Sequence, residues 1–186
     1  QTSSGYYAIE NNVVGNISTS TALYGLFPAN VSAAGITQKC STAGTLQVIR
    51  GNTVYGISSS TPTQRVRIAA ITWLGPASGN HEISANFIYG LTLSTSDVSS
   101  FIDGILLEGG SVLCANNIVN LGDNLIKGYT ISGIYDNSGS GNLSRIYFNT
   151  LYIGGTVTQG VTSGTAALRN TSNACPRDYR NNILFN

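Results

Sequence analysis

The side chains that could carry acid–base or metal chemistry are few in this sequence and lie far apart. Its one histidine, His81, stands next to Glu82. Between Glu82 and residue 140 the further carboxylates are scattered, namely Asp97, Asp103, Glu108, Asp123 and Asp136. No two of them fall at matching positions of neighbouring repeats, whereas a glycosidase needs a pair of carboxylates at the scissile bond. We therefore predict no catalytic residues and no cofactor.

The cysteines do not form a metal-binding pattern either. Cys40, Cys114 and Cys175 are the three cysteines, and no C-x-x-C pair occurs. A structural zinc site would need such closely spaced ligands, so we predict no metal. An odd number leaves at least one cysteine unpaired within the chain. Cys40 and Cys114 stand at different positions of the repeat, and we predict that they form no disulfide.

Tyrosines recur at intervals that match an internal repeat. Tyr55 and Tyr89 occupy one such position, with Tyr152 further along, and Tyr147 and Tyr179 occupy another. Aromatic rings stacked on an outer surface can bind sugar rings. They also stabilise neighbouring strands, by about 0.2–1 kcal/mol per pair. The structural interpretation is favoured, and glycan binding through these tyrosines is the functional alternative.

The composition limits the classes of partner. Hydrophobic residues make up 41% of the 186 residues, while charged residues make up 9% and the formal charge is +1. Phosphate recognition needs clustered cations, so we predict no nucleic-acid partner. No apolar run approaches the length of a membrane span, and we predict no membrane insertion. The many Ser, Thr and Asn residues suit a secreted surface protein.

An internal repeat organises the whole chain. The phrase x-Ile-x-x-Asn-x-aliphatic, seen at Arg145–Leu151, recurs in degraded form at intervals of 30 to 40 residues. Its asparagines are Asn12, Asn52, Asn86, Asn116, Asn149 and Asn181. Each interval contains about three short strand-like runs separated by Ser, Gly and Asn, and no segment has a helical period. The sequence therefore predicts one domain over residues 1–186, a right-handed parallel β-helix of about five coils with three strands per coil.

Each asparagine is predicted to lie at a bend between two strands. Asn tolerates the left-handed backbone that such a bend needs, and stacked Asn side chains can hydrogen-bond from coil to coil. We therefore expect a structural asparagine ladder. The residues predicted to point inward three before and two after these asparagines include Leu113, Ile118 and Ile183. The long interval between Asn12 and Asn52 predicts a loop around residues 23–30.

Glu82 meets only a distant cation in this arrangement. It is predicted to share an outward column with Arg145, two coils or about 10 Å away, with Val112 between them. Ala8, Val48 and Arg177 complete that predicted column. Polysaccharide lyases and hydrolases with this fold group acids and cations on one face. One acid is too few, so isolated surface charges are the favoured interpretation.

The carboxyl-terminal part resembles a known family. Arg145–Thr158 (RIYFNTLYIGGTVT) and Arg177–Asn186 (RDYRNNILFN) are similar to the β-helix repeat region of large secreted Bacteroidota proteins, which end in a type IX secretion sorting domain. The match is good over residues 143–186 and looser before them. The resemblance implies export to the cell surface or medium and a place in a longer polypeptide. It implies no common activity and transfers no catalytic residue.

These observations predict a secreted or cell-surface module with a structural or adhesive role and with surface glycans as its partners. One alternative is a carbohydrate-active β-helix enzyme, and another is the subunit of an extracellular fibre. At the carboxyl end, residues 181–186 begin a new coil whose interior would be exposed. We expect further coils of a longer protein, or another copy of the chain, to cover it.

Overall fold

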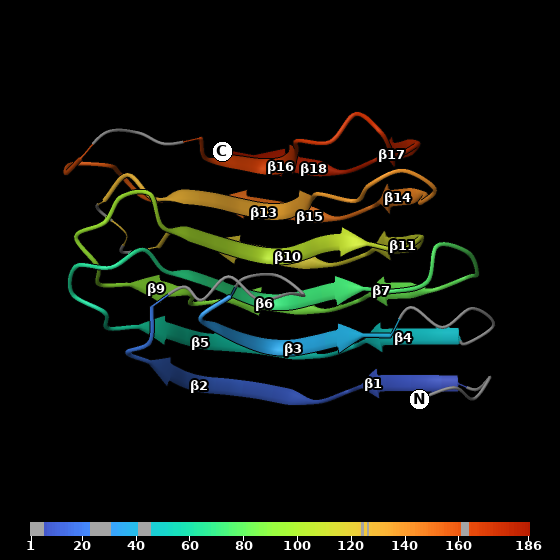
Figure 1. Cartoon of the computed structure of the whole chain (residues 1–186), viewed down its shortest axis with the longest axis horizontal. Helices are drawn as coiled ribbons and strands as arrows, with labels where there is room; N and C mark the ends of the chain where they lie inside the picture. Colours follow the sequence, from blue (N-terminus) through green and yellow to red (C-terminus); the bar gives the residue numbers. More distant parts are fainter. Residues whose placement is uncertain (1–5, 23–30, 41–45, 124, 126, 161–163) are drawn as a thin grey trace.

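The computed structural model describes residues 6–22, 31–40, 46–123, 125, 127–160 and 164–186. Within these ranges the elements are strands, arranged in three parallel sheets that the chain visits in turn (Figure 1). The predicted parallel β-helix with three strands per coil is therefore confirmed. The predicted loop around residues 23–30 lies outside the described residues.

Sheet A, sheet B and sheet C are built from strands that are neighbours in space and one coil apart in sequence. Sheet A contains β1 (Tyr6–Glu10), β4 (Leu46–Arg50), β7 (Glu82–Ser84), β11 (Val112–Ala115), β14 (Ser144–Tyr147) and β17 (Arg177–Arg180). Sheet B contains β2 (Val13–Thr19), β5 (Thr53–Ser59), β8 (Phe87–Tyr89), β12 (Ile118–Leu121), β15 (Thr150–Ile153) and β18 (Ile183–Phe185), and β9 (Thr92–Leu93) also pairs with β5. Sheet C contains β3 (Ala33–Lys39), β6 (Arg67–Leu74), β10 (Phe101–Gly109), β13 (Thr130–Asp136) and β16 (Ala166–Asn170).

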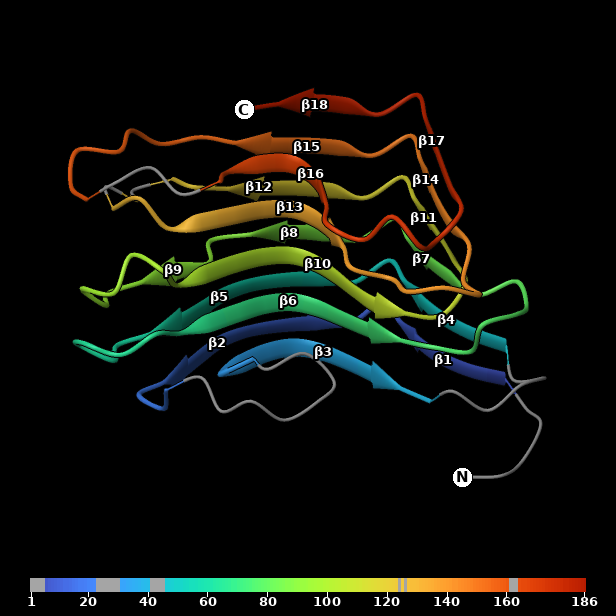
Figure 2. The same cartoon turned by 45° about the horizontal axis from the view of Figure 1, so that its top comes forward.

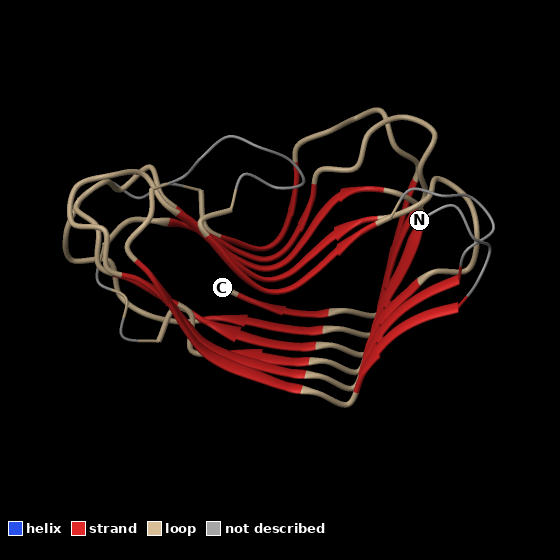
Figure 3. Ribbon diagram, turned by 60° about the horizontal axis from the view of Figure 1, so that its bottom comes forward, coloured by secondary structure: helices blue, strands red, loops and turns tan. Residues whose placement is uncertain are grey.

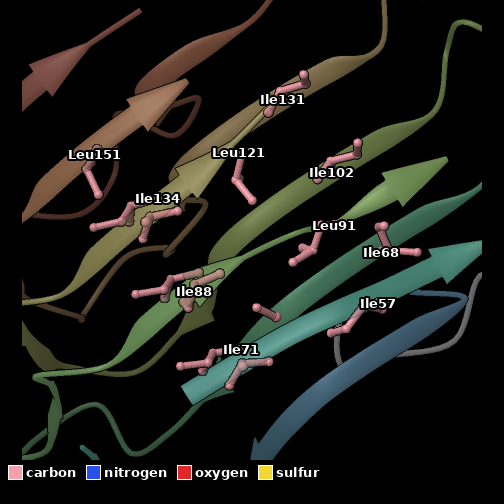
Figure 4. Packing of buried hydrophobic residues seen from close by; sticks show 14 of the residues in the cluster. Ile57, Ile68, Ile71, Ile88, Leu91, Ile102, Leu121, Ile131, Ile134 and Leu151 are labelled. Carbon is pink, nitrogen blue, oxygen red and sulfur yellow. The ribbon is translucent and has the colours of Figure 1, made fainter. Parts of the chain in front are cut away.

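The core is a set of aliphatic columns between the three sheets. In sheet C one inward column runs through Ile36, Ile71, Ile105, Ile134 and Leu168. The interior also receives Ile88 and Leu151 from sheet B, both fully buried (Figure 4). Every coil places the same kind of side chain at the equivalent position of its strand. Each aliphatic group therefore packs on its counterparts in the coils above and below.

Small residues precede that isoleucine column in sheet C. They are Gly35, Ala70, Gly104, Gly133 and Ala167. A Cβ at Gly104 would lie 2.5 Å from the Gly133 carbonyl oxygen and 2.6 Å from Val119 Cγ1, so no side chain fits there. The chain therefore approaches the interior closely at this point, and the strands of sheet C bow inward (Figures 2 and 3).

The asparagine ladder exists, with two of its members one residue later than predicted. Its side chains are Asn12, Asn52, Asn86, Asn117, Asn149 and Asn182. Each Oδ1 after that of Asn12 accepts hydrogen bonds of 2.9–3.0 Å from the backbone N and the Nδ2 of the ladder asparagine before it. Each Nδ2 after Asn12 also donates to a backbone carbonyl of the preceding coil.

Asn116 and Asn181, which the sequence assigned to the ladder, are the residues just before it. Both have positive φ, of 56° and 53°. The same corner position is occupied with positive φ by Asn11, Gly51, Ala85 and Phe148. The left-handed bend is thus made by the residue before the ladder asparagine, and the prediction that one asparagine does both was wrong. The one-residue shift of the ladder occurs at residues 116–117 and 181–182, where two asparagines follow each other.

The inward columns shift with this correction. Leu113 pairs with Glu82, while Cys114 pairs with Ile83 and is fully buried. Ile118 is 49% and Ile183 66% exposed, because Val119 and Leu184 hold the inward positions. The interior assignments of Leu113, Ile118 and Ile183 were therefore wrong by one residue, which reverses the face of a strand.

The cysteines are free, as predicted for Cys40 and Cys114. The Cys114 sulfur accepts a hydrogen bond of 3.4 Å from Asn117 Nδ2. Burial, reinforced by the charge of Asp136, raises the pKa of the Cys114 thiol. This thiol is therefore protonated and shielded at neutral pH.

Replacing Asn117 by Ala should lower the free energy of unfolding by about 3 kcal/mol, because the buried Asn86 backbone N–H and the Ile83 carbonyl lose their partners. Asn116→Gly is the matched control and should change it by less than about 1 kcal/mol, since Gly accepts positive φ freely. Urea unfolding monitored by circular dichroism measures both. A larger effect at residue 116 than at residue 117 would contradict this ladder register.

Iodoacetamide at neutral pH should label Cys40, which is partly exposed, and leave Cys114 unmodified until the chain is unfolded in urea. Intact mass and peptide mapping before and after unfolding measure this order. Labelling of Cys114 in the folded chain, or a mass deficit showing a disulfide between Cys40 and Cys114, would contradict it.

Candidate functional site

The outer surface of sheet B carries an aromatic face made of two columns. One column is Val13, Thr53, Phe87, Ile118, Thr150 and Ile183, and the other is Gly15, Tyr55, Tyr89, Asn120, Tyr152 and Phe185. The residues between them, such as Val54 and Ile88, point into the core and are fully buried. Because successive side chains of a strand alternate between its two faces, both columns point outward.

Rings of this aromatic face stack from coil to coil. The centroids of Tyr55 and Tyr89 are 5.3 Å apart with 9° between the ring planes. Phe87 lies 4.9 Å from Tyr89. Tyr152 and Phe185 form a second pair, at 5.2 Å and 16°. The prediction that Tyr55, Tyr89 and Tyr152 share one outward column is confirmed.

Asn120 separates the two ring pairs. In register it lies between Tyr89 and Tyr152, so these two rings are two coils, or about 10 Å, apart. Its Oδ1 is shielded from solvent and has no hydrogen-bond partner, which is rare for a buried polar atom. A hydroxyl group brought to this position could donate to it.

The aromatic face has no charged side chain in either column. Phe87, Ile118, Tyr152 and Phe185 are between 40% and 62% exposed. An exposed surface that is flat, apolar and uncharged suits a neutral ligand that offers both CH groups and hydroxyls.

Tyr147 and Tyr179 do not share a column, contrary to the prediction. Tyr147 pairs with Arg180, and Tyr179 pairs with Ile146. Tyr179 packs against the core and donates a 2.8 Å hydrogen bond to the buried Asp136. Burial and this bond raise the pKa of Tyr179. The ladder shift explains the error, and Tyr179 has a structural role.

Tyr147 stays near the surface of sheet A. Its hydroxyl donates a 2.7 Å hydrogen bond to Asp178 Oδ2, which raises the pKa of Tyr147, and Arg180 lies over its ring. Tyr147 therefore interacts with two residues of the adjacent strand β17 and is not part of the aromatic face.

His81 and Glu82 do not form an acid–base pair. His81 is buried, its Nδ1 accepts from the Gln47 backbone N at 3.2 Å, and its Nε2 lies 2.9 Å from the Ser78 carbonyl. Both ring nitrogens are thus used by the backbone. Glu82 accepts a hydrogen bond from Ser84.

The predicted outward column of Glu82 is partly confirmed. It contains Ala8, Val48, Glu82 and Arg145. Leu113 stands where Val112 was predicted, and Asp178 stands where Arg177 was predicted. Glu82 and Arg145 are therefore two coils apart with an apolar residue between them. Asp178 is next to Arg145 in the column but is paired with Arg180, so the column gives no acid–base cluster.

A charged cluster that the sequence did not predict lies on sheet C. Asp103 is fully buried, and Arg67 Nε donates to its Oδ2 at 2.7 Å. Arg67 Nη1 also lies 3.8 Å from Glu108 Oε1. Burial raises the pKa of Asp103, and Arg67 opposes that shift. Asp103 and Glu108 lie on the same strand, so a comparison of equivalent positions on adjacent coils does not bring them together. In the structure the long Arg67 side chain contacts both carboxylates.

Neither a metal-ligand cluster nor a membrane-spanning helix is found among the described residues. No group of three His, Cys, Asp or Glu side chains is placed to hold a metal ion within these ranges. Among the described residues there is also no helix of the length and apolarity needed to cross a bilayer.

Comparison with known proteins finds no matching family model, no matching curated protein and no matching solved structure. The resemblance to secreted Bacteroidota proteins therefore stays an expectation from the residues that carry it.

Replacing Arg67 by Met should lower the free energy of unfolding by about 3–5 kcal/mol, because it leaves the Asp103 carboxyl buried without its cation. Arg65→Met is the matched control, since Arg65 is exposed and also lies over the Phe101 ring. It should cost less than about 1 kcal/mol. Chemical denaturation measures both, and equal effects would show that the buried pair is not what Arg67 stabilises.

Proposed function

We propose that this chain is a secreted or cell-surface β-helix module that binds a neutral glycan along the aromatic face of sheet B. The observation that carries the proposal is the pair of ring stacks on an exposed, uncharged surface, on either side of an amide oxygen without a partner. Sugar rings present CH groups to aromatic rings and hydroxyls to amides, and this surface offers both.

The location outside the cell rests on composition and resemblance. Charged residues are 9% of the chain, and the Arg177–Asn186 segment resembles the repeats of exported proteins. A binding role is favoured over an enzymatic one for this surface, because its two columns contain no carboxylate, histidine or cysteine.

Tyr89→Ala and Tyr152→Ala should each weaken binding to a neutral polysaccharide by about tenfold, because each removes one ring next to Asn120. Affinity electrophoresis in gels containing soluble cellulose, xylan or mannan derivatives gives the dissociation constants. Tyr6→Ala is the matched control, since Tyr6 is 54% exposed but belongs to sheet A. It should bind like the unaltered chain.

Thermal unfolding of the same variants separates binding from folding. The lost ring pairs should cost at most about 1 kcal/mol of stability. If the unaltered chain binds none of the neutral glycans, or if Tyr6→Ala weakens binding as much as Tyr89→Ala, the aromatic face is not a glycan site.

A further inference from the structure

A stack of cations and aromatic rings lies on the outer surface of sheet C, on a different sheet from the aromatic face. The Arg67 guanidinium carbon is 5.2 Å from the ring centroids of both Phe101 and Tyr135. Arg65 covers Phe101 at 4.8 Å, and Arg169 covers Tyr135 at 4.8 Å. Arg65, Phe101, Arg67, Tyr135 and Arg169 therefore form one continuous arginine stack.

The arginine stack lies outside the core. Tyr135 packs with Ala69, Leu106 and Val31 in a small apolar cluster that is separate from the interior one. The strands beneath it bow inward, so the backbone of sheet C is concave on its outer side (Figure 3). Outward side chains near the two ends of one strand therefore lean toward each other.

Cations exceed anions in this cluster. Three arginines face two carboxylates, Asp103 and Glu108. Asp103 is occupied by Arg67, and Glu108 Oε2 accepts a 3.2 Å hydrogen bond from Asn137. The Tyr135 hydroxyl is bonded to Thr171 at 2.8 Å. One oxygen of each acid and the Tyr135 hydroxyl are thus already engaged within the protein.

Two guanidinium nitrogens in the stack are shielded from solvent and have no partner. They are Arg67 Nη2 and Arg169 Nη1, from the two arginines that cover Tyr135. Asp103 Oδ1 and Ser132 Oγ also lack a partner. Asp103 Oδ1 is an acceptor on the carboxylate that Arg67 already binds, but it is a single oxygen, whereas Arg67 Nη2, Arg169 Nη1 and Ser132 Oγ are three unpartnered donors. Buried donors are almost always satisfied in native proteins, so the two guanidinium nitrogens point to a missing acceptor.

We propose that the concave outer surface of sheet C binds an anionic group of a sugar chain, a carboxylate or a sulfate. Arg67 Nη2 and Arg169 Nη1 donate to its oxygens, and Tyr135 holds the two guanidinium planes in place. Arginine suits this role because its planar donor groups match the oxygens of such anions, and its ring contacts limit its freedom before binding. Arg169 is only half-buried, so its side chain can turn toward a ligand.

Isothermal titration of the full chain with tetragalacturonate and with a sulfated tetrasaccharide tests the proposal, and a neutral tetrasaccharide of the same length is the reference. Because the aromatic face is proposed to bind neutral sugars, the comparison uses the Tyr89→Ala chain. It should bind at least one acidic probe more tightly than the neutral one, and the affinity should fall as salt increases. Arg169→Gln should weaken that binding by about tenfold or more. Arg180→Gln, which removes an exposed arginine of sheet A, should not.

Several outcomes would overturn the proposal. They are no binding of either acidic probe at millimolar concentration, equal binding of the neutral sugar by the Tyr89→Ala chain, or unaltered binding of the acidic probe by Arg169→Gln. Thermal unfolding must first show that Arg169→Gln is folded, and Tyr135→Phe, which keeps the ring, should retain binding. Tyr89→Ala should leave the acidic sugar bound, so a failure of this site can be told from a failure of the aromatic face.

Discussion

At the corner between sheets A and B, one asparagine side chain in each coil satisfies backbone groups that the bend leaves without partners. Its Oδ1 accepts two hydrogen bonds from the coil before, and its Nδ2 donates to a carbonyl of that coil. Asn52, Asn86, Asn117 and Asn149 are at most 1% exposed, so an unpaired amide here would be costly. These bonds form only when the coils are in register. The ladder therefore fixes the register of the strand that follows each asparagine, and with it which side chains of that strand point into the core.

That register decides what the outer surfaces present. On sheet B the residues one and three after each ladder asparagine form two outward columns, where Tyr55 meets Tyr89 and Tyr152 meets Phe185. On sheet C the small residues Gly104 and Gly133 let the strand bow inward. Outward side chains there lean toward one another, and Arg67 reaches both Asp103 and Glu108 along one strand. A flat uncharged surface and a concave charged one thus follow from the same repeat.

The sequence predicts the fold because the repeated pattern of isoleucine, asparagine and glycine leaves few other ways to bury the aliphatic side chains. It predicts the ladder less well where two asparagines are adjacent. At Asn116 and Asn117 one residue takes the positive φ and the other enters the ladder, and composition alone does not separate these roles. The residue two positions later does not separate them either, because Ile118 and Val119 are both aliphatic. Only the structure shows that Val119 is fully buried and continues the column of Ile88 and Leu151, while Ile118 is exposed.

The charged cluster shows a second limit of prediction from the sequence. It depends on the length of the side chains and on the curvature of the strand, and the repeat pattern specifies neither. In a straight β-helix, comparing equivalent positions on adjacent coils finds the pairs that matter, as it does for Tyr55 and Tyr89. On a bowed sheet, residues five apart on one strand can face a common partner, as Asp103 and Glu108 face Arg67. A search for sites in such repeats must therefore include contacts along the strand wherever small residues bend it inward.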